Sequence, residues 1–444
     1  MTKMKIDKDF YPIYLFNGEF EKRLEKAEAS QLTFSLERNG GFRKTVSVAV
    51  LPDGRDDNLN FTYAERLIKT VLWIYGGFKL QIRAESALLG RLLAAYRKGG
   101  LRDFDVCFFE KVYGVPFVAE YSEAIDATAD EKIIPSAKAD GARIGFDAGG
   151  SDMKIAAVLD GKTLFSDEIV WHPKINSNPE YHISKIKGAI EEARRHLPRV
   201  DKLGVSSAGI YIDNETRVAS LFIKVPDGEY GKVRTVYKDI ARELKVPLTV
   251  ANDGDVAALA GSMELKLNNL LGIALGTSEA VGYVDADGCL TGRLNELAFV
   301  PVDVNPDAEI DDWSGDYGAG AKYLSQDGVI KLAEKAGISL KNGETPAEKL
   351  KLVQQLAEKC DISTENVFYD VGCYLAYSLM YYLDFYGFDN VLLMGRVMSG
   401  RGGEIIFDAA KEVLKEKGFS DKIKLILPDE KSRRVGQAVA AAYL

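Results

Sequence analysis

The stretch RIGFDAGGSDMKIAAVLDGKTLFSDEIV, residues 143–170, decides the fold of this chain. Its apolar runs, with a tight glycine-rich turn after the first, predict three consecutive strands that form a β-meander. The residues that follow favour a helix near 181–196, a buried strand at 202–212, a helix near 235–245 and a short strand at 247–253. The sequence therefore predicts the order β-β-β-α-β-α-β.

A second set of strands is expected further along the chain, at NLLGIALG (269–276), at AVGYVDADG (280–288) and at the segment ending FVPVDV (299–304). After them the pattern is mostly helical as far as Leu444. This arrangement predicts two related α/β lobes. A cleft between two such lobes is a common place for a small ligand to bind.

The first 120 residues or so alternate helical and strand-like patterns and predict an α+β domain in its own right. Residues 122–142 lose large apolar side chains, as connectors between domains do. We expect an accessory α+β domain at 1–135, one lobe at 143–255 together with 430–444, and the other lobe at 256–429.

Composition narrows the classes of function. The 444 residues carry a formal net charge of -9, which argues against a large non-specific contact with nucleic acid or with an anionic membrane. The longest apolar stretches are too short to cross a bilayer, and residues 1–16 do not have the pattern of a signal peptide. We therefore expect a cytoplasmic protein whose partners are small molecules or other proteins. The four cysteines form no CxxC pair, which fits reduced thiols.

The first motif that carries chemistry is Asp147-Ala148-Gly149-Gly150-Ser151, at the turn between two predicted strands, with Lys154 three residues on. Glycines let the backbone approach a phosphate closely, and a hydroxyl with peptide N–H groups can hold its oxygens. Asp147 could reach Mg²⁺ directly or through water. Read alone, the same residues also fit an ordinary hairpin turn.

A second turn of the same kind, Leu275-Gly276-Thr277-Ser278, follows an apolar strand and precedes another. Two such turns, one in each lobe, could face each other and hold a polyphosphate between them. Together they are more informative than either turn alone.

The third motif is Asn252-Asp253, at the end of a buried strand and the start of a helix. An acidic residue at this position often serves only as a helix cap. Projecting into a cleft, however, Asp253 could take a proton from an attacking alcohol while Asn252 fixes a hydroxyl group.

The fourth motif is a strand ending at Gly395, followed by a glycine-rich loop that opens a helix. Such a loop could pass close beneath a nucleotide base and ribose, although a plain surface loop has the same composition.

Together these four motifs resemble the ROK family (repressors, open reading frames and kinases), and the resemblance covers residues 143–444. It implies the two-lobed, ribonuclease H-like ATPase fold of actin, Hsp70 and sugar kinases, here behind an additional N-terminal α+β domain. It also implies ATP and Mg²⁺ as cofactors. The resemblance implies a role for each motif residue: Asp253 as general base; Asn252, Glu296 and Gly209 on the sugar side; Asp147 in the Mg²⁺ shell; and Gly149, Gly150, Ser151, Lys154, Gly276, Thr277 and Gly395 around the nucleotide.

The chain departs from the family pattern on the sugar side. A segment that usually reads Gly-Glu-Ile-Gly-His is here residues 295–299, so Glu296 is retained while Phe299 stands at the histidine position. The cysteine-rich zinc loop is replaced by residues 300–320, which contain no Cys or His, so no zinc is expected. A later sugar-contacting Glu corresponds to Ala321. The second phosphate loop carries Ser278 and Ala280 where glycines are common.

Other residues could replace these losses. The aromatic side chains of Phe299, Trp313 and Tyr317 could stack on a sugar face, or they could pack in the core. Hydroxyl acceptors are available in the same segment, from Asp311, Asp312 or Asp316.

Three functions remain open from the sequence. The first is an ATP- and Mg²⁺-dependent kinase of a sugar or sugar-like metabolite. The second is a catalytically weak sensor of sugar or nucleotide that signals through the N-terminal domain, which lacks the basic character of a DNA reader. The third is an assembly protein with an empty cleft, against which the retained Asn252-Asp253 argues. A homodimer is an expectation from the family alone.

Overall fold

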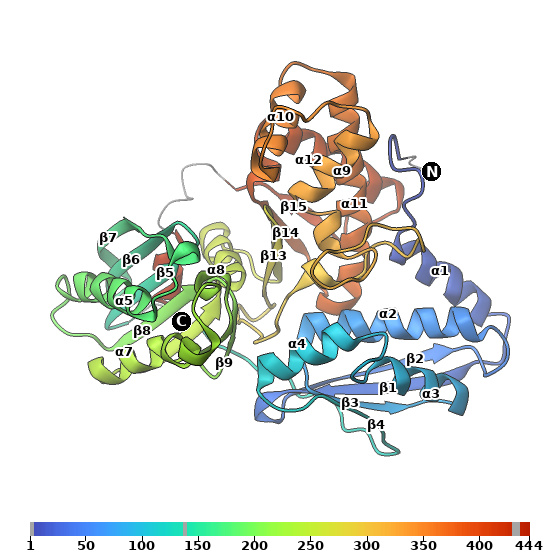
Figure 1. Ribbon diagram of the computed structural model, residues 1–444, viewed down its shortest axis with the longest axis horizontal. Helices are drawn as coiled ribbons and strands as arrows, with labels where there is room; N and C mark the ends of the chain where they lie inside the picture. The colour runs from blue at the N-terminus through green and yellow to red at the C-terminus, as the bar shows by residue number, and fades with distance from the viewer. Residues whose placement is uncertain (1–3, 136–139, 429–435) are drawn as a thin grey trace.

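The computed structural model describes residues 4–135, 140–428 and 436–444. Figure 1 shows three bodies: an N-terminal region (residues 4–135), a first lobe that contains strand β5 (Ala142–Ala148) and a second lobe that contains strand β14 (Asn390–Met394). Residues 430–435, which the sequence analysis assigns to the first lobe, lie outside the described residues.

The N-terminal region is an α+β unit with a four-stranded sheet of order β2-β1-β3-β4. Its strands are β1 (Ser30–Glu37), β2 (Arg43–Val50), β3 (Lys79–Arg83) and β4 (Val118–Tyr121). Its helices are α1 (Ile13–Leu24), α2 (Asp57–Tyr75), α3 (Ser86–Ala95) and α4 (Asp103–Tyr113). Helix α2 is buried along most of its length, because it lies between the sheet and the second lobe (Figure 1).

The first lobe contains the predicted meander followed by α/β crossovers, in a five-stranded sheet of order β11-β8-β5-β6-β7. Its strands are β5 (Ala142–Ala148), β6 (Asp152–Leu159), β7 (Lys162–Val170), β8 (Lys202–Ser207) and β11 (Leu248–Asn252), with a β9 (Ile210–Ile212) and β10 (Glu215–Val218) hairpin. Its helices are α5 (Pro179–Arg194), α6 (Tyr230–Arg234), α7 (Val236–Leu244) and α13 (Gly436–Ala441). Helix α13 lies directly on the sheet because Gly145 lacks a side chain: a Cβ there would meet the Ala438 carbonyl oxygen at 1.8 Å.

The second lobe has a four-stranded sheet of order β13-β12-β14-β15. Its strands are β12 (Leu270–Leu275), β13 (Glu279–Val284), β14 (Asn390–Met394) and β15 (Lys424–Ile426). Its helices are α9 (Gln326–Lys335), α10 (Pro346–Ala357), α11 (Ile362–Tyr386) and α12 (Gly400–Glu416). Helix α8 (Asp253–Leu265) packs against this sheet and against α13 of the first lobe.

In the part of the chain that the structure describes, no helix is both long and apolar enough to cross a membrane.

One expected strand is absent from the described residues of this sheet. The segment FVPVDV forms no ladder and makes only isolated bridges, between Pro301 and Ala319 and between Asp303 and Pro12 of the N-terminal region. The backbone of this segment is instead paired with a loop of its own lobe and with the start of α1. Short 3-10 helices complete the chain at Asn39–Gly41, Pro173–Ile175, Ser220–Phe222, Asp227–Glu229, Leu297–Phe299, Gly320–Lys322 and Arg396–Met398.

The N-terminal region and the second lobe share one hydrophobic core. Trp73 of α2 stacks on Phe299, with ring centroids 4.2 Å apart. At the far end of the interface, Asp370 of α11 accepts hydrogen bonds from the backbone N–H groups of residues 5–7, at 2.7 to 2.9 Å. The contact with the first lobe runs through α4 against β9 and β10. The N-terminal region is thus built onto the second lobe and also reaches the first.

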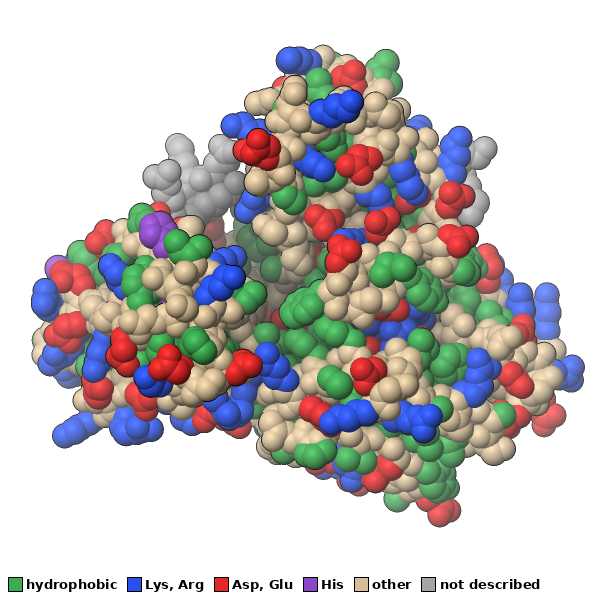
Figure 2. Space-filling model, viewed as in Figure 1, with side chains coloured by type: hydrophobic (Ala, Val, Ile, Leu, Met, Phe, Trp, Pro, Cys, Tyr) green, Lys and Arg blue, Asp and Glu red, His purple; other side chains and the backbone are tan. Residues whose placement is uncertain are grey.

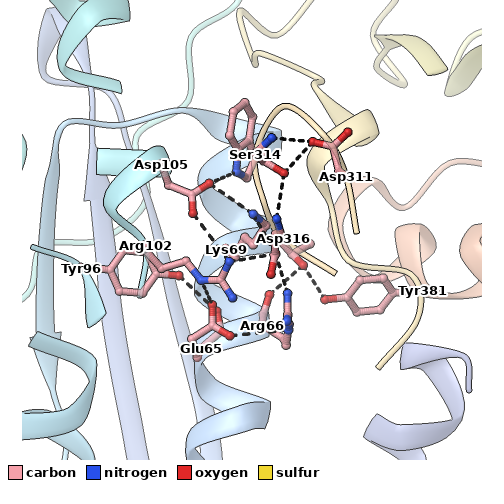
Figure 3. A network of polar contacts seen from close by, with 12 residues as sticks. Glu65, Arg66, Lys69, Tyr96, Arg102, Asp105, Asp311, Ser314, Asp316 and Tyr381 are labelled. Carbon is pink, nitrogen blue, oxygen red and sulfur yellow. Dashed lines mark hydrogen bonds and ion pairs between the residues drawn. The ribbon is translucent and has the colours of Figure 1, made fainter. Parts of the chain in front are cut away.

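A buried cluster of charges fastens this interface (Figure 3). The Oδ2 atom of Asp316, in the second lobe, lies 2.6 Å from Arg66, 3.0 Å from Lys69 and 2.8 Å from Arg102 of the N-terminal region. Glu65 and Asp105 are the other two carboxylates of the cluster, so three cations meet three anions. Burial alone would raise the pKa of Asp316, but the three cations hold it well below its usual range.

Replacing Asp316 by Asn should destabilise the protein by about 3–5 kcal/mol, because it leaves three buried cations with only two carboxylates. Denaturant unfolding at pH 7 would measure the loss. The control is Asp312→Asn, since Asp312 is 92% exposed and pairs with Lys322 at the surface, where replacing it should have little effect. Equal losses in the two variants would mean that the cluster does not fasten the interface.

Candidate functional site

The carboxyl ends of three parallel strands place a row of polar side chains at one edge of the first-lobe sheet. Asp147 of β5 lies opposite Ser206 of β8, and Ser207 lies opposite Asn252 of β11. The Ser206 hydroxyl donates to Asp147 Oδ1 at 2.5 Å. Burial raises the pKa of Asp147 to about 6, and the nearby negative charge of Asp253 acts in the same direction. Asp147 and Asp253 are therefore electrostatic neighbours.

The first glycine-rich turn joins β5 to β6. The backbone N–H of Gly149 donates to the Asp152 carbonyl at 2.9 Å, and Ser151 lies exposed at its tip. Lys154 Nζ is 3.0 Å from Asp152 Oδ1 and 3.9 Å from Asp147 Oδ2. A Cβ at Gly150 would meet the Lys174 side chain at 3.2 Å, so a second cation lies over this turn. The turn therefore has exposed residues, Gly150 and Ser151, with the positive charges of Lys154 and Lys174 nearby.

Asn252 and Asp253 stand where β11 ends and α8 begins. Asn252 Oδ1 caps the helix by accepting from Gly254 N at 2.7 Å, and its Nδ2 donates to the Gly209 carbonyl at 2.8 Å. Gly209 has a φ of +128°, and a Cβ there would meet the Val218 carbonyl oxygen at 2.4 Å, so glycine is required. Burial raises the pKa of Asp253, while its own helix-start N–H bonds and Lys174 oppose the rise.

The second glycine turn and Gly395 meet in the second lobe. Gly276 closes the turn between β12 and β13 with a 3.0 Å bond from its N–H to the Ser278 carbonyl, and Thr277 is exposed at the tip. Gly395 has a φ of +96°, and a Cβ there would lie 2.3 Å from the Leu275 carbonyl oxygen. Gly395 therefore lies directly against Leu275, the residue that precedes Gly276.

A pocket of about 370 Å³ opens beside Asp253. Figure 2 shows the surface hollowed between the first lobe and the rest of the molecule. The pocket is lined by Ala208, Asn252, Asp253, Ser278, Glu279, Ala280, Val281, Leu294, Asn295, Glu296, Ala298, Phe299, Asp311, Trp313 and Ala321. Of the residues predicted for the sugar side, Asn252, Asp253 and Glu296 line it, while Gly209 lies next to the lining residue Ala208. The residues predicted for the nucleotide are outside this lining.

The N-terminal region supports the loop that forms one wall of this pocket. The backbone N–H groups of Asn295 and Glu296 donate to the carbonyls of Ile74 and Trp73, at the end of α2, at 3.1 Å each. Asn295 also donates through Nδ2 to Asp255 of α8 at 2.8 Å. Burial, with the charges of Asp253 and Asp255, raises the pKa of Glu296 to about 7. The position of Glu296 therefore depends on two other parts of the fold.

The segment that stands in the place of a zinc loop divides its side chains between two tasks. Trp313 and Asp311 line the pocket, and the Trp313 ring centroid is 5.1 Å from that of Phe299, the pocket residue just before the segment. Asp316 belongs to the buried charge cluster and Tyr317 lies under the Arg66 guanidinium, 3.9 Å from its ring centroid. Neither of these two, nor Asp312, is among the residues that line the pocket.

Sequence reasoning missed Ser206 and Lys174 beside the first glycine-rich turn, and it missed three residues at the pocket. Glu279 is a buried carboxyl in the pocket lining, and Asp255 and Trp73 position the loop that carries Glu296. A signal existed for Glu279, because an acidic residue opens an otherwise apolar strand. No local pattern points to Trp73, which reaches the site from another part of the chain.

Comparisons with known proteins agree with this fold. A model of the ROK family matches residues 143–403. Among solved structures, the fold is similar to a ROK hexokinase from Thermus thermophilus, with 17% identity, 68% of this chain and 97% of that chain covered, and a TM-score of 0.54. The fold is also similar to a ROK family glucokinase from Streptomyces griseus in complex with glucose and AMPPNP. The identity is 17%, the match covers 68% of this chain and 98% of that chain, and the TM-score is 0.50.

A ROK family transcriptional regulator, a homologue of the MLC protein of E. coli, is similar in fold as well, with 17% identity, 68% and 78% of the two chains covered, and a TM-score of 0.52. A search of curated proteins gave no match. Both kinases and regulators therefore share this fold. Since the family model spans more than half of the chain, this protein belongs to the ROK family.

Proposed function

We propose that this protein transfers the γ-phosphoryl group of ATP to a hydroxyl group of a sugar or sugar-like acceptor. The observation that carries the proposal is the placement of Asp253, which lines the acceptor pocket and lies close enough to Asp147 to raise its pKa. A carboxylate on the acceptor side and one on the phosphate side thus stand at the ends of β11 and β5, on either side of β8, where they can position the two reactants for transfer.

In the proposed step, the acceptor oxygen attacks the γ-phosphorus and the bond from that phosphorus to the β–γ bridging oxygen breaks. ADP leaves with the electron pair of that bond, and Asp253 takes the proton of the acceptor hydroxyl. Burial raises the pKa of Asp253 above its ordinary value, which makes the carboxylate a stronger base near neutral pH.

The phosphate side fits a nucleotide with Mg²⁺. The Oδ1 atom of Asp147 accepts from Ser206, whereas its Oδ2 atom has Lys154 at 3.9 Å and is the oxygen left for a cation or its waters. Two glycine turns offer backbone N–H groups for phosphate oxygens, and we assign Gly395 to the adenosine side. Bound Mg²⁺ would neutralise charge that develops on the phosphates. We also infer that the chain divides into an accessory domain at 1–135, a first lobe at 143–255 together with 430–444, and a second lobe at 256–429.

The alternative function is a sensor that binds a sugar or nucleotide without effective turnover. Its support is the contact between α2 and the pocket wall, because a ligand that moves Glu296 would also pull on Trp73 and so on the N-terminal region. The similar fold of a regulator fits this alternative too. Turnover separates the two functions.

Replacing Asp253 by Asn should lower kcat by about 100-fold or more, because the variant lacks the proton acceptor. ADP release from Mg-ATP, measured over a panel of hexoses, amino sugars and polyols, would show the loss. The matched control is Asp287→Asn, the same change at an exposed carboxylate paired with Lys132. Wild-type rates in the Asp253 variant would rule out the general-base role, and an inactive wild type that still binds ligand would favour the sensor.

The dependence of kcat/KM on pH should show an acid limb above the ordinary aspartate pKa of 3.8, since burial raises the pKa of Asp253. Only the deprotonated carboxylate accepts a proton, so activity should fall as the pH falls through that raised pKa. Circular dichroism at each pH would show that the protein stays folded. A rate that stays constant down to pH 3.8 would exclude Asp253 as the base.

Replacing Ser206 by Ala should raise the pKa of Asp147 further above 6, because the hydroxyl now stabilises the charged form. Mg-ATP binding should weaken roughly tenfold at pH 7. Isothermal calorimetry gives the affinity and carbon NMR of the aspartate carboxyl gives the pKa. The control is Ser207→Ala, since the Ser207 hydroxyl bonds to Tyr237 and Tyr211 instead. Equal behaviour of the two variants would contradict the role of Asp147.

A further inference from the structure

The pocket beside Asp253 has an unusual balance of charge. Four carboxyl side chains line it, those of Asp253, Glu279, Glu296 and Asp311, and its described lining contains no Lys, Arg or His. Neutral sugar sites also use carboxylates, but each buried carboxylate then needs enough donors to offset the loss of water. The partners of these four groups therefore decide what the pocket is built to hold.

Glu279 is the pocket carboxyl whose two oxygens are both buried without a hydrogen-bond partner among the described residues. It is 4% exposed, and within the described part of the chain neither carboxyl oxygen has a hydrogen bond. The hydroxyl of Tyr382 lies near it without completing one. Its space exists because residue 320 is glycine: a Cβ there would meet Glu279 Oε2 at 2.4 Å. Burial raises the pKa of Glu279 to about 8, as expected for a carboxyl that lacks donors.

The partners of the other three pocket carboxyls bring no cation into the described pocket lining. Burial and the negative charges of Asp253 and Asp255 act on Glu296 and raise its pKa. Asp311 accepts from the backbone N–H and the hydroxyl of Ser314, at 2.7 and 2.6 Å. Lys174 is the cation that acts on Asp253, and it lies over the phosphate turn. The described lining thus offers the pocket carboxyls no cationic side chain, and a ligand that carries a positive charge can provide one.

Aromatic rings line the same pocket. Trp313 is 59% exposed and stands edge-on to Phe299, with ring centroids 5.1 Å apart. A ring face attracts either the apolar face of a sugar or an ammonium group. Carboxylates and aromatic faces together are the combination that recognises cationic ligands.

We propose that Glu279 is an acceptor-binding residue and that the acceptor is a hydroxyl compound with a protonated amine, such as an amino sugar. This inference rests on the proposed function, because it names the substrate class of the same site. An ammonium group brings three donors and one positive charge, so it satisfies the free Glu279 oxygens and offsets the negative lining at once. A neutral hexose of the same shape supplies donors but no charge.

Calorimetric binding without ATP tests the inference with matched ligands: glucosamine, N-acetylglucosamine and glucose at pH 7, and the corresponding galactose and mannose series. The amine should bind at least about tenfold more tightly than its acetylated and neutral partners in one of the series. Glu279→Gln should remove this preference, because it keeps the size of the side chain but has no proton to release, so it cannot become the negative partner of the ammonium group. Glu264→Gln, at an exposed position on α8, is the control and should keep the preference.

A second variant separates binding from folding. Glu279→Met should raise the midpoint of thermal unfolding while it abolishes amine binding, because a buried carboxyl without donors destabilises the free protein. A merely structural role for Glu279 predicts a lower midpoint instead. A lower midpoint in Glu279→Met, or tighter binding of a neutral sugar that Glu279→Gln leaves unchanged, would overturn the inference.

The inference and the proposed function fail in different ways. Phosphorylation of a neutral sugar with no preference for the amine would overturn the inference and leave the kinase in place. Tight, Glu279-dependent binding of the amine with no ADP release would support the binding residue and overturn the kinase.

Discussion

The acceptor side of this protein depends on the sharing of one carboxylate, that of Asp316, among three cations. Arg66 and Lys69 come from α2 and Arg102 from the residue just before α4, while Asp316 comes from the segment that stands in the place of a zinc loop. A loop without regular strands needs an anchor, because ordering its backbone costs about 1–2 kcal/mol per residue. The buried ion pairs of Asp316 with three cations provide that anchor here.

The same interface connects the pocket wall to helices α2 and α8 through hydrogen bonds. Backbone bonds from residues 295 and 296 end on α2, and the side chain of Asn295 ends on Asp255 of α8. Helix α8 also begins with Asp253, the proposed base. A shift of the N-terminal region would therefore reach both the acceptor wall and the base, which is why kinase and sensor remain natural uses of one architecture.

Most of the architecture could be predicted from the sequence, because it rests on local patterns. The meander at residues 143–170 and the strand that ends at Asn252 have strong apolar runs with defined turns, and both formed as predicted. The segment FVPVDV has the same apolar pattern, yet it makes isolated bridges, because residues distant in the sequence take its backbone. The ion pairs of Asp316 could not be predicted either. Its partners lie some 210 to 250 residues away, and no local pattern encodes a contact at that separation.

Two groups of buried carboxylates in this protein differ in their partners. One group stabilises the fold, and the other is suited to binding a ligand. Around Asp316 each carboxylate meets a cation of the same fold, so the cluster is neutral and gains nothing from a ligand. Around Glu279 the carboxyls face a hollow without a cation in its described lining, so the protein retains a destabilising arrangement that folding alone does not explain. Residues kept against stability are expected where function requires them. The unpaired Glu279, rather than the well-paired Asp316, is therefore the group through which the acceptor should be sought.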